Sequence, residues 1–191
     1  MSITSKSDIL QKTAHLFANK GYDGFSMRTL AQEIPITPSV LYHHFTDKDA
    51  LLKAMYESLN KELGSKRAAL KPEKSAFDML KQRIAFQIDN QEQIVAVLKY
   101  YLAYRNDFKR FKDGFVPDKS ALHIEEVLQY GMKTGEFHIV DMESDAKVIA
   151  HAINGFLLEY HPYTPTGKEK EELIERISSF LMRALKGGEY K

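Results

Sequence analysis

The sequence predicts an all-α protein of about nine helices, with a helix-turn-helix head at the N-terminus and a helical body behind it. Apolar residues recur at helical spacing along almost all of the 191 residues, whereas the alternating pattern of β-strands is scarce. Prolines, glycines and capping residues divide this pattern into segments of helix length. The segments are short at the N-terminus and longer afterwards, and no internal repeat is present.

The first expected helix carries Leu10, Thr13, Ala14 and Phe17 on one face. It should end at Gly21, because glycine is the usual residue at a helix C-terminal cap. The spacing therefore predicts one amphipathic helix before the first turn.

Two short helices follow, joined by a turn of a few residues. Ser26 is a good N-cap for the second helix, residues 27–33. Thr37 caps the third, residues 38–44, in which Pro38 takes the first position, where its missing N–H costs no hydrogen bond.

The remaining helices are longer. Thr46 begins a capping box for the fourth, which should run to Gly64. Apolar residues at helical spacing mark five more helices. Ser144 is the expected N-cap of the fourth of these five. The markers are Phe77, Leu80, Ile84 and Ile88; Ile94, Val97, Leu98, Tyr101 and Leu102; Ala121, Ile124, Leu128 and Met132; Ile149, Ala152, Ile153, Phe156, Leu157 and Tyr160; and Leu173, Ile177, Phe180, Leu181 and Ala184.

Composition excludes several classes of protein. The absence of cysteine excludes disulfides, thiolate metal sites and cysteine nucleophiles. His43 and His44 are neighbours on one helix and point about 100° apart, so they are not expected to share a metal ion. No catalytic triad, carboxylate pair or glycine-rich phosphate loop stands out, so neither an enzyme nor a cofactor is expected.

The chain is expected to be a cytoplasmic protein without a membrane segment. Its N-terminus lacks the apolar stretch of a signal peptide, and the most apolar run, residues 148–158, is too short to span a bilayer. The net charge is +1, and the first 50 residues carry no net positive charge. Any contact with nucleic acid must therefore depend on where the charges lie.

Two short helices joined by a tight turn have the geometry of a helix-turn-helix, whose second helix enters the major groove of DNA. That helix should be small and polar at its start and should reach phosphates at its end. The small start is Thr37, Pro38 and Ser39; the side chains placed for phosphates are Tyr42, His43 and Lys48; those expected to point inward are Val40, Leu41 and Phe45.

Residues 8–55 resemble the DNA-binding domain of the TetR family of bacterial transcriptional regulators. The resemblance depends on a set of residues at fixed spacing, and no single piece of it is specific. The set is Leu10, Ala14, Leu16, Phe17, Gly21, Tyr22, Ser26, Leu30, Ala31, Leu41, Tyr42, His44, Phe45, Lys48 and Leu51.

The resemblance implies a DNA-binding role for eight residues. Ser26 and Arg28 would contact a phosphate or a base; Thr37, Pro38, Ser39 and His43 would face bases or backbone; Tyr42 and Lys48 would contact phosphates. Two positions depart from the family pattern, since Pro35 and Ser39 stand where the family usually has glycine. Proline cannot supply the positive φ that glycine allows, so the turn itself is expected to differ.

The resemblance also implies a domain division, with a DNA-binding domain at residues 1–48 and an effector-binding and dimerisation domain at 49–191. The last two long helices, about 144–160 and 169–186, would pair between two subunits. The expected dimer interface is Ile153, Phe156, Leu157, Ile177, Phe180 and Leu181; the candidate effector pocket is Phe86, Tyr101, Tyr104, Phe108, Tyr130 and His151. Outside the family comparison, the aromatic residues between 100 and 115 are typical of a connector, with a single-strand stacking platform as the alternative.

The expected function is that of a ligand-responsive repressor, which binds a palindromic site on double-stranded DNA as a homodimer and is released by a small molecule. The alternative is a helical small-molecule-binding or adaptor protein that no longer binds DNA. The effector, the operator and the regulated genes are not encoded in the pattern, nor is the choice between repression and activation.

Overall fold

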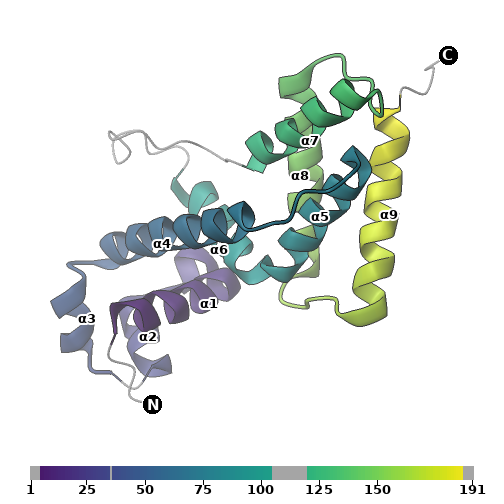
Figure 1. The fold of residues 1–191 in the computed structure, drawn as a ribbon. Coiled ribbons are helices and arrows are strands. Elements are labelled where there is room, and N and C mark those ends of the chain that lie inside the picture. Colours follow the sequence, from purple (N-terminus) through teal and green to yellow (C-terminus); the bar gives the residue numbers. More distant parts are fainter. Residues whose placement is uncertain (1–4, 35, 105–119, 187–191) are drawn as a thin grey trace. The chain divides into compact units, whose positions relative to one another are not determined.

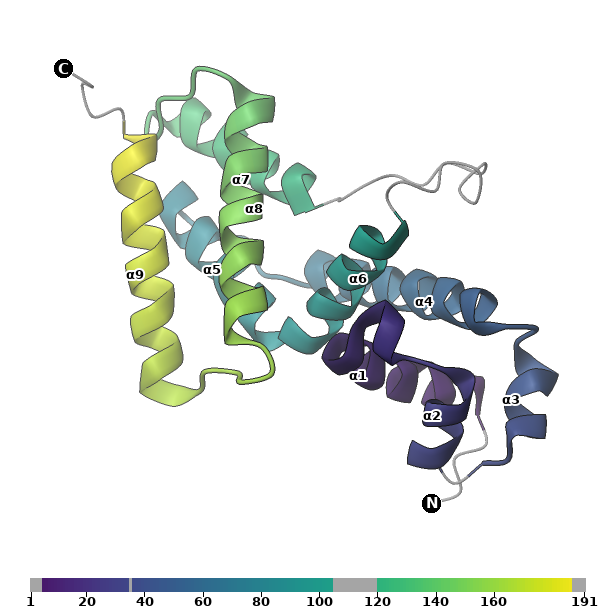
Figure 2. The same cartoon turned by 180° about the vertical axis from the view of Figure 1, so that it is seen from behind.

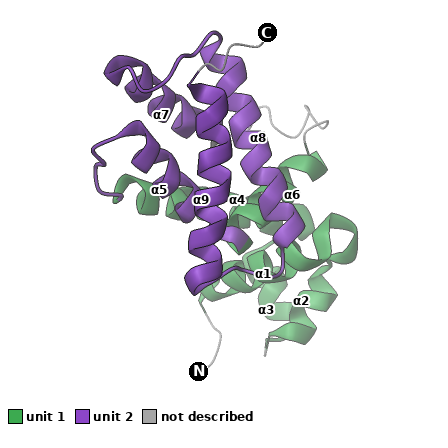
Figure 3. Cartoon of the chain, turned by 90° about the vertical axis from the view of Figure 1, so that its right-hand side faces the viewer, with its two compact units in different colours: residues 1–69, 92–115 green, residues 70–91, 116–191 purple. Residues whose placement is uncertain are grey.

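The computed structural model describes residues 5–34, 36–104 and 120–186. Within these ranges it contains nine α-helices and no strand, which confirms the all-α prediction. None of the helices in these ranges combines the length and the apolar character that a bilayer-crossing segment needs. The chain divides into two compact units, which Figure 3 colours separately: unit 1 is residues 1–69 with 92–115, and unit 2 is residues 70–91 with 116–191.

Unit 1 contains the short helices and two long ones (Figure 1). They are α1 (Lys6–Gly24), α2 (Met27–Glu33), α3 (Pro38–His44), α4 (Lys48–Ala68) and, after its first residue, α6 (Gln91–Tyr104). α1 packs on α4 and α2 packs on α3 (Figures 1 and 2). One apolar core joins them, and its members include Phe17, Leu30, Leu41, Leu51, Met55, Val95 and Tyr100.

Unit 2 contains α5 (Ala76–Asp89), α7 (Ser120–Thr134), α8 (Met142–Tyr160) and α9 (Gly167–Leu185). α7 runs along α8, and α5 packs against both α7 and α9. A glycine is required at position 131, because a Cβ there would lie 2.1 Å from the ring of Phe137. That close approach seats the buried Phe137 ring against the end of α7.

Local signals set most helix starts, and some predictions of them were wrong. Ser26 caps α2 as predicted, and Gly21 interrupts α1 with φ at 67°. The caps of α4 and α8 are Asp47 and Asp141, because their carboxylates accept bonds from backbone N–H groups in the first turn. Thr46 and Ser144 were the wrong choices.

The end of α4 was also misplaced. The helix continues past Gly64 to Ala68, because the backbone of Gly64 stays helical and its neighbour Leu63 is buried. α4 belongs to unit 1, with α1. The functional division at residues 48 and 49 stays a prediction, since compactness alone does not define a functional boundary.

Candidate functional site

The α2–α3 pair is built on a capping box and a buried anchor. The N–H of Thr29 donates to Ser26 Oγ at 3.0 Å, and the N–H of Ser26 donates to Thr29 Oγ1 at 2.9 Å, which fixes the start of α2. In α3 only Leu41 is buried, and Phe45 is buried directly after it. These two inward-pointing residues are as predicted.

The rest of α3 faces outward. Thr37, Pro38, Ser39 and His43 are exposed, and Tyr42 keeps 56% of its surface. Val40 was predicted to point inward and is 37% exposed, because a seven-residue helix anchored by Leu41 turns position 40 away from the core. The N-terminal half of α3 therefore presents small, exposed side chains.

The other predicted DNA contacts lie on the elements beside α3. Arg28, on α2, is exposed. Ser26 is half-buried, and its hydroxyl donates to Thr29 Oγ1 at 3.1 Å. The hydroxyl that was expected to reach a phosphate is therefore already used in the cap of α2. Pro35, in the turn between α2 and α3, lies outside the described residues.

Lys48 begins α4 and is half-buried. Its ammonium donates to the Tyr22 backbone oxygen at 2.5 Å and lies 3.8 Å from the centre of the Tyr22 ring. Burial lowers the pKa of Lys48, while the charges of Asp49 and Asp23 act against that shift. One edge of the ammonium is thus bound inside the protein.

The paired histidines behave as separate side chains. His43 is exposed and His44 is half-buried, with their ring centres 5.4 Å apart and the rings nearly perpendicular. The His44 ring also contacts Phe45, with centres 6.2 Å apart. Within the described ranges, no three side chains of the His, Asp or Glu type gather as metal ligands.

The predicted effector residues are divided between the two units. Tyr104 is 4% exposed in the core of unit 1, and Tyr101 lies half-buried on the same helix. Phe86, Tyr130 and His151 belong to unit 2, on α5, α7 and α8 respectively. Phe108 lies outside the described residues.

None of the five described candidates lines the cavity found in unit 2. Phe86 is buried on the opposite face of α5, His151 is exposed, and Tyr130 donates to the Lys74 carbonyl at 3.3 Å. The aromatic character of these residues was a weak signal, since Tyr100 and Tyr104 are simply part of the unit 1 core. Their burial also leaves no stacking platform in the described part of that segment.

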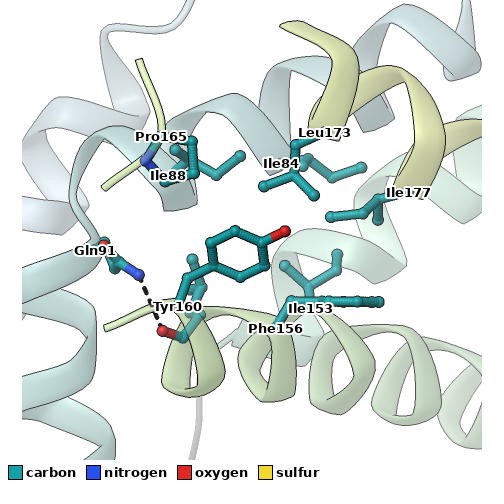
Figure 4. A pocket seen from close by; sticks show the side chains of 10 residues that line it. Ile84, Ile88, Gln91, Ile153, Phe156, Tyr160, Pro165, Leu173 and Ile177 are labelled. Atoms are coloured by element: carbon teal, nitrogen blue, oxygen red, sulfur yellow. Dashed lines mark hydrogen bonds between the residues drawn. The ribbon is translucent and has the colours of Figure 1, made fainter. Parts of the chain in front are cut away.

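The cavity in unit 2 is small and apolar (Figure 4). The space open to the centre of a water-sized sphere is about 10 Å³. Figure 4 shows the ring of Tyr160 in the middle of the lining side chains. The Gln91 amide N–H donates to the carbonyl of Leu157 at 3.0 Å. The cavity is lined by Ile84, Ile88, Gln91, Ile153, Phe156, Leu157, Tyr160, Pro165, Leu173 and Ile177.

Unit 2 also holds buried polar groups that the sequence analysis missed. Asn154, on α8, is 5% exposed, and neither end of its amide has a hydrogen-bond partner within the described part of the chain. The same is true of Gln87 Oε1 and of two nitrogens of Arg83, both on α5. The third Arg83 nitrogen lies 3.3 Å from Glu126. A polar residue inside an apolar stretch, such as Asn154 in "HAINGF", is the signal that could have revealed them.

The predicted dimer interface divides into buried and exposed residues. Four members are buried inside unit 2 itself and are therefore not presented at a surface: Ile153, Leu157, Ile177 and Leu181. Phe156 on α8 and Phe180 on α9 remain 41% and 62% exposed. The sequence predicted that the whole apolar sector of α8 and α9 forms the interface, whereas packing within unit 2 covers most of that sector. Val148, 67% exposed, continues the uncovered apolar surface on α8.

Known proteins resemble this chain in its helix-turn-helix region. The family model of the bacterial regulatory proteins of the tetR family matches residues 9–55. The HTH-type transcriptional regulator UidR of Escherichia coli K12 is 33% identical over 51 residues, 27% of this chain and 26% of the relative. The HTH-type transcriptional repressor Rv1474c of Mycobacterium tuberculosis is 40% identical over 50 residues, 26% of this chain and 27% of the relative. The chain thus matches about a quarter of the length of these relatives.

Solved structures extend the likeness to the fold of nearly the whole chain. The ketosteroid regulator KstR2 of Mycobacterium tuberculosis has a TM-score of 0.68 at 16% identity, covering 98% of each chain. The TetR-family regulator PfmR of Thermus thermophilus has a TM-score of 0.67 at 23% identity, covering 92% of this chain and 97% of the other. Residues 9–55 thus match the tetR family of bacterial regulatory proteins, and the chain shares its fold with solved regulators of that family.

Proposed function

We propose that the protein is a ligand-responsive repressor, which binds a palindromic operator as a homodimer and is released by a small molecule. The observation that carries the proposal is α3, a helix whose one buried residue, Leu41, holds an otherwise exposed and mostly polar surface. A helix of this kind in second position of a helix-turn-helix enters the major groove.

The contacts to DNA divide by type. Thr37, Pro38 and Ser39, at the start of α3, would meet base edges, which small polar and apolar groups can read. Tyr42 and His43 would lie against the backbone at the other end of the helix. Their exposure supports this assignment.

Arg28 and Lys48 would add phosphate contacts beside α3. Arg28 is exposed, and the Lys48 ammonium has two further N–H groups after its bond to the Tyr22 carbonyl. The half-buried Ser26 is the weakest of the proposed contacts, because its hydroxyl serves the cap of α2.

Dimerisation compensates for the low charge of the head. Two heads on one palindrome double the number of phosphate contacts, and the second head binds at high effective concentration. The exposed Phe156 and Phe180 support an interface formed by α8 and α9 of two copies. The two α3 helices would then enter successive major grooves, roughly 34–36 Å apart.

The effector would act through unit 2. Its cavity, at about 10 Å³, holds no more than about one water, so a small molecule must displace lining side chains in order to bind. Phe156 lines this cavity and is also part of the proposed interface. Ligand binding can therefore repack α5, α8 and α9 and change the spacing of the heads. By reciprocity, operator DNA must weaken ligand binding by the same factor.

The test is a gel shift with footprinting on the DNA upstream of the coding sequence. We expect protection of a palindromic site, and we expect Tyr42→Phe combined with Lys48→Ala to reduce affinity by at least about 100-fold. Tyr163→Phe combined with Lys168→Ala is the matched control, since it makes the same two changes on exposed residues of unit 2. Unchanged binding in the first pair would remove our assignment of the contacts.

The second candidate function is a helical small-molecule-binding or adaptor protein without DNA binding. The lack of net positive charge in the first 50 residues is the observation in its favour. A complete absence of binding to duplex DNA at low salt, where phosphate contacts are strongest, would favour it over the repressor.

A further inference from the structure

A cluster of three side chains lies directly behind Lys48, inside unit 1. Tyr22 donates its hydroxyl to Asp49 Oδ1 at 3.1 Å, and Tyr104 donates its hydroxyl to the same oxygen at 2.5 Å. The two tyrosine rings meet edge to face, with centres 5.4 Å apart and planes at 86°. Asp49 thus gathers one ring from α1 and one from the last residue of α6.

Lys48 rests on one member of this cluster. Its ammonium donates to the Tyr22 backbone oxygen and lies over the face of the Tyr22 ring, 3.8 Å from its centre. A cation over an aromatic face is attracted by the ring quadrupole, so the position of the ring helps to fix the position of the ammonium. Whatever orients Tyr22 therefore orients Lys48.

Tyr104 is well suited to hold that orientation. It is 4% exposed, and its ring also packs on Tyr100 at 4.5 Å between centres. Burial, with the hydrogen bond to Asp49, raises the pKa of Tyr104, so its hydroxyl stays a donor at neutral pH. A buried donor on a carboxylate is a strong, geometrically fixed contact.

We infer that Asp49 and Tyr104 are positioning residues for DNA binding, which hold Lys48 in place for its phosphate by clamping the ring of Tyr22. The inference rests on the proposed function, and in particular on the role of Lys48 as a phosphate contact. Without the Tyr104 hydroxyl, the Asp49 carboxylate loses a donor and attracts the neighbouring Lys48 ammonium more strongly, away from DNA. Tyr104 comes from α6, so an element far from α3 in sequence contributes to operator affinity.

The experiment is a double-mutant cycle on the full-length protein. The probe is a duplex recovered by selection from random-sequence DNA, and affinity is measured over a range of salt concentrations. Tyr104→Phe removes one oxygen and keeps the buried ring. We expect it to weaken binding by about 5- to 10-fold and to reduce the slope of log affinity against log salt toward that of Lys48→Ala, since a lost phosphate contact lowers the slope by about one per protomer.

The decisive comparison is made in the Lys48→Ala background. There Tyr104→Phe should change affinity by less than about twofold, because its effect passes through Lys48. Tyr100→Phe is the matched control, since it removes the hydroxyl of a neighbouring buried tyrosine on the same helix and should leave the salt slope unchanged. Asp49→Asn in the same cycle repeats the test if Tyr104→Phe unfolds the head, and thermal unfolding confirms that each variant is folded at the assay temperature.

The possible results distinguish a failure of the proposed function from a failure of the positioning role alone. If Lys48→Ala itself leaves affinity and salt slope unchanged, or no duplex is recovered, the proposed function fails. If Lys48→Ala weakens binding but the effects of Tyr104→Phe and Lys48→Ala simply multiply, or Tyr104→Phe has no effect, the positioning role is overturned and the proposed function stands. Coupled effects with a shared loss of slope support the inference.

Discussion

Unit 1 and unit 2 are both built from helices around an apolar core, yet they treat their polar and apolar side chains in opposite ways. In unit 1, Asp49 accepts hydrogen bonds from the hydroxyls of Tyr22 and Tyr104, and most of the exposed side chains of α3 are polar. In unit 2, Asn154 and Gln87 are buried with polar atoms that have no partner in the described part of the chain, while Phe156 and Phe180 are exposed.

This difference indicates which unit is complete by itself. A helix-turn-helix must present fixed side chains to DNA, so its interior has to be fully bonded. Under the proposed function, a ligand and a second copy would cover the unpartnered groups and the exposed rings of unit 2. We therefore expect mutations inside the helix-turn-helix head to lower its stability directly. Mutations in unit 2 should act through its contacts with a ligand or a second copy.

The largest expected effect is the loss of stability on replacing Leu41, the buried residue that anchors α3. Leu41→Ala should destabilise the protein by about 2–5 kcal/mol, because the side chain is fully buried and α3 has no other buried residue. Chemical denaturation measures the loss. Val40→Ala, the adjacent exposed position, is the control and should stay within about 0.5 kcal/mol of the wild type. Equal effects at the two positions would contradict the orientation of α3.

The next largest expected effect is on dimerisation, through the exposed apolar side chains of unit 2. Phe156→Glu combined with Phe180→Glu should produce a monomer in analytical ultracentrifugation and lower operator affinity by about 100-fold, because the second head loses its high effective concentration. Val140→Glu, at a position that is 90% exposed, should leave the dimer intact. A double variant that remains dimeric would place the interface elsewhere.

The unpartnered amide gives a smaller effect, of opposite sign. Asn154→Leu should stabilise unit 2 by about 1 kcal/mol, because it removes a buried polar group that has no hydrogen bond to any described residue and fills similar space with an apolar one. The same variant should lose its response to the effector if the amide serves ligand recognition. Thermal unfolding and effector-dependent DNA release measure the two parts. A loss of stability would mean that a buried water already satisfies Asn154.

The smallest effect concerns the first turn of α5, where Glu136 accepts bonds from backbone N–H groups. Glu136 accepts bonds from the Ala76 N–H at 2.9 and 3.0 Å and from the Thr134 hydroxyl at 2.9 Å. Burial acts to raise the pKa of Glu136, but these bonds, with one from the Phe77 N–H, outweigh it and hold the pKa below its ordinary value of 4.5. The contribution to stability is then complete above pH 4.5 and is lost as the pH falls through the lowered pKa.

Glu136→Gln should accordingly destabilise the protein by about 0.5–1 kcal/mol at pH 7, and the difference should disappear toward about pH 3. Denaturation at a series of pH values provides the measurement. A difference between variant and wild type that stays constant with pH would show that the charge of Glu136 is not what stabilises the start of α5.

Predictions succeeded where a residue acts on its own backbone and failed where packing between helices decides. Ser26, Gly21 and Pro38 act through their own backbone and their immediate neighbours, so the interruption of α1 at Gly21 and the starts of α2 and α3 could be predicted from sequence. Val40 was misassigned because the apolar face of a two-turn helix is decided by the core below it. The effector residues stay a prediction, because aromatic spacing on a helix does not say whether a ring faces a core or a cavity.

The sequence by itself determined the helical class, the short helices at the N-terminus and the polar start of α3, because helix periodicity, capping and turn chemistry act over a few residues. Only the tertiary structure decided that Ile153 and Ile177 are core while Phe156 and Phe180 are surface, and that Tyr104 reaches Asp49 across more than fifty residues of chain. These properties depend on which helices pack together. Burial and long-range hydrogen bonds arise from that packing, and local pattern does not encode it.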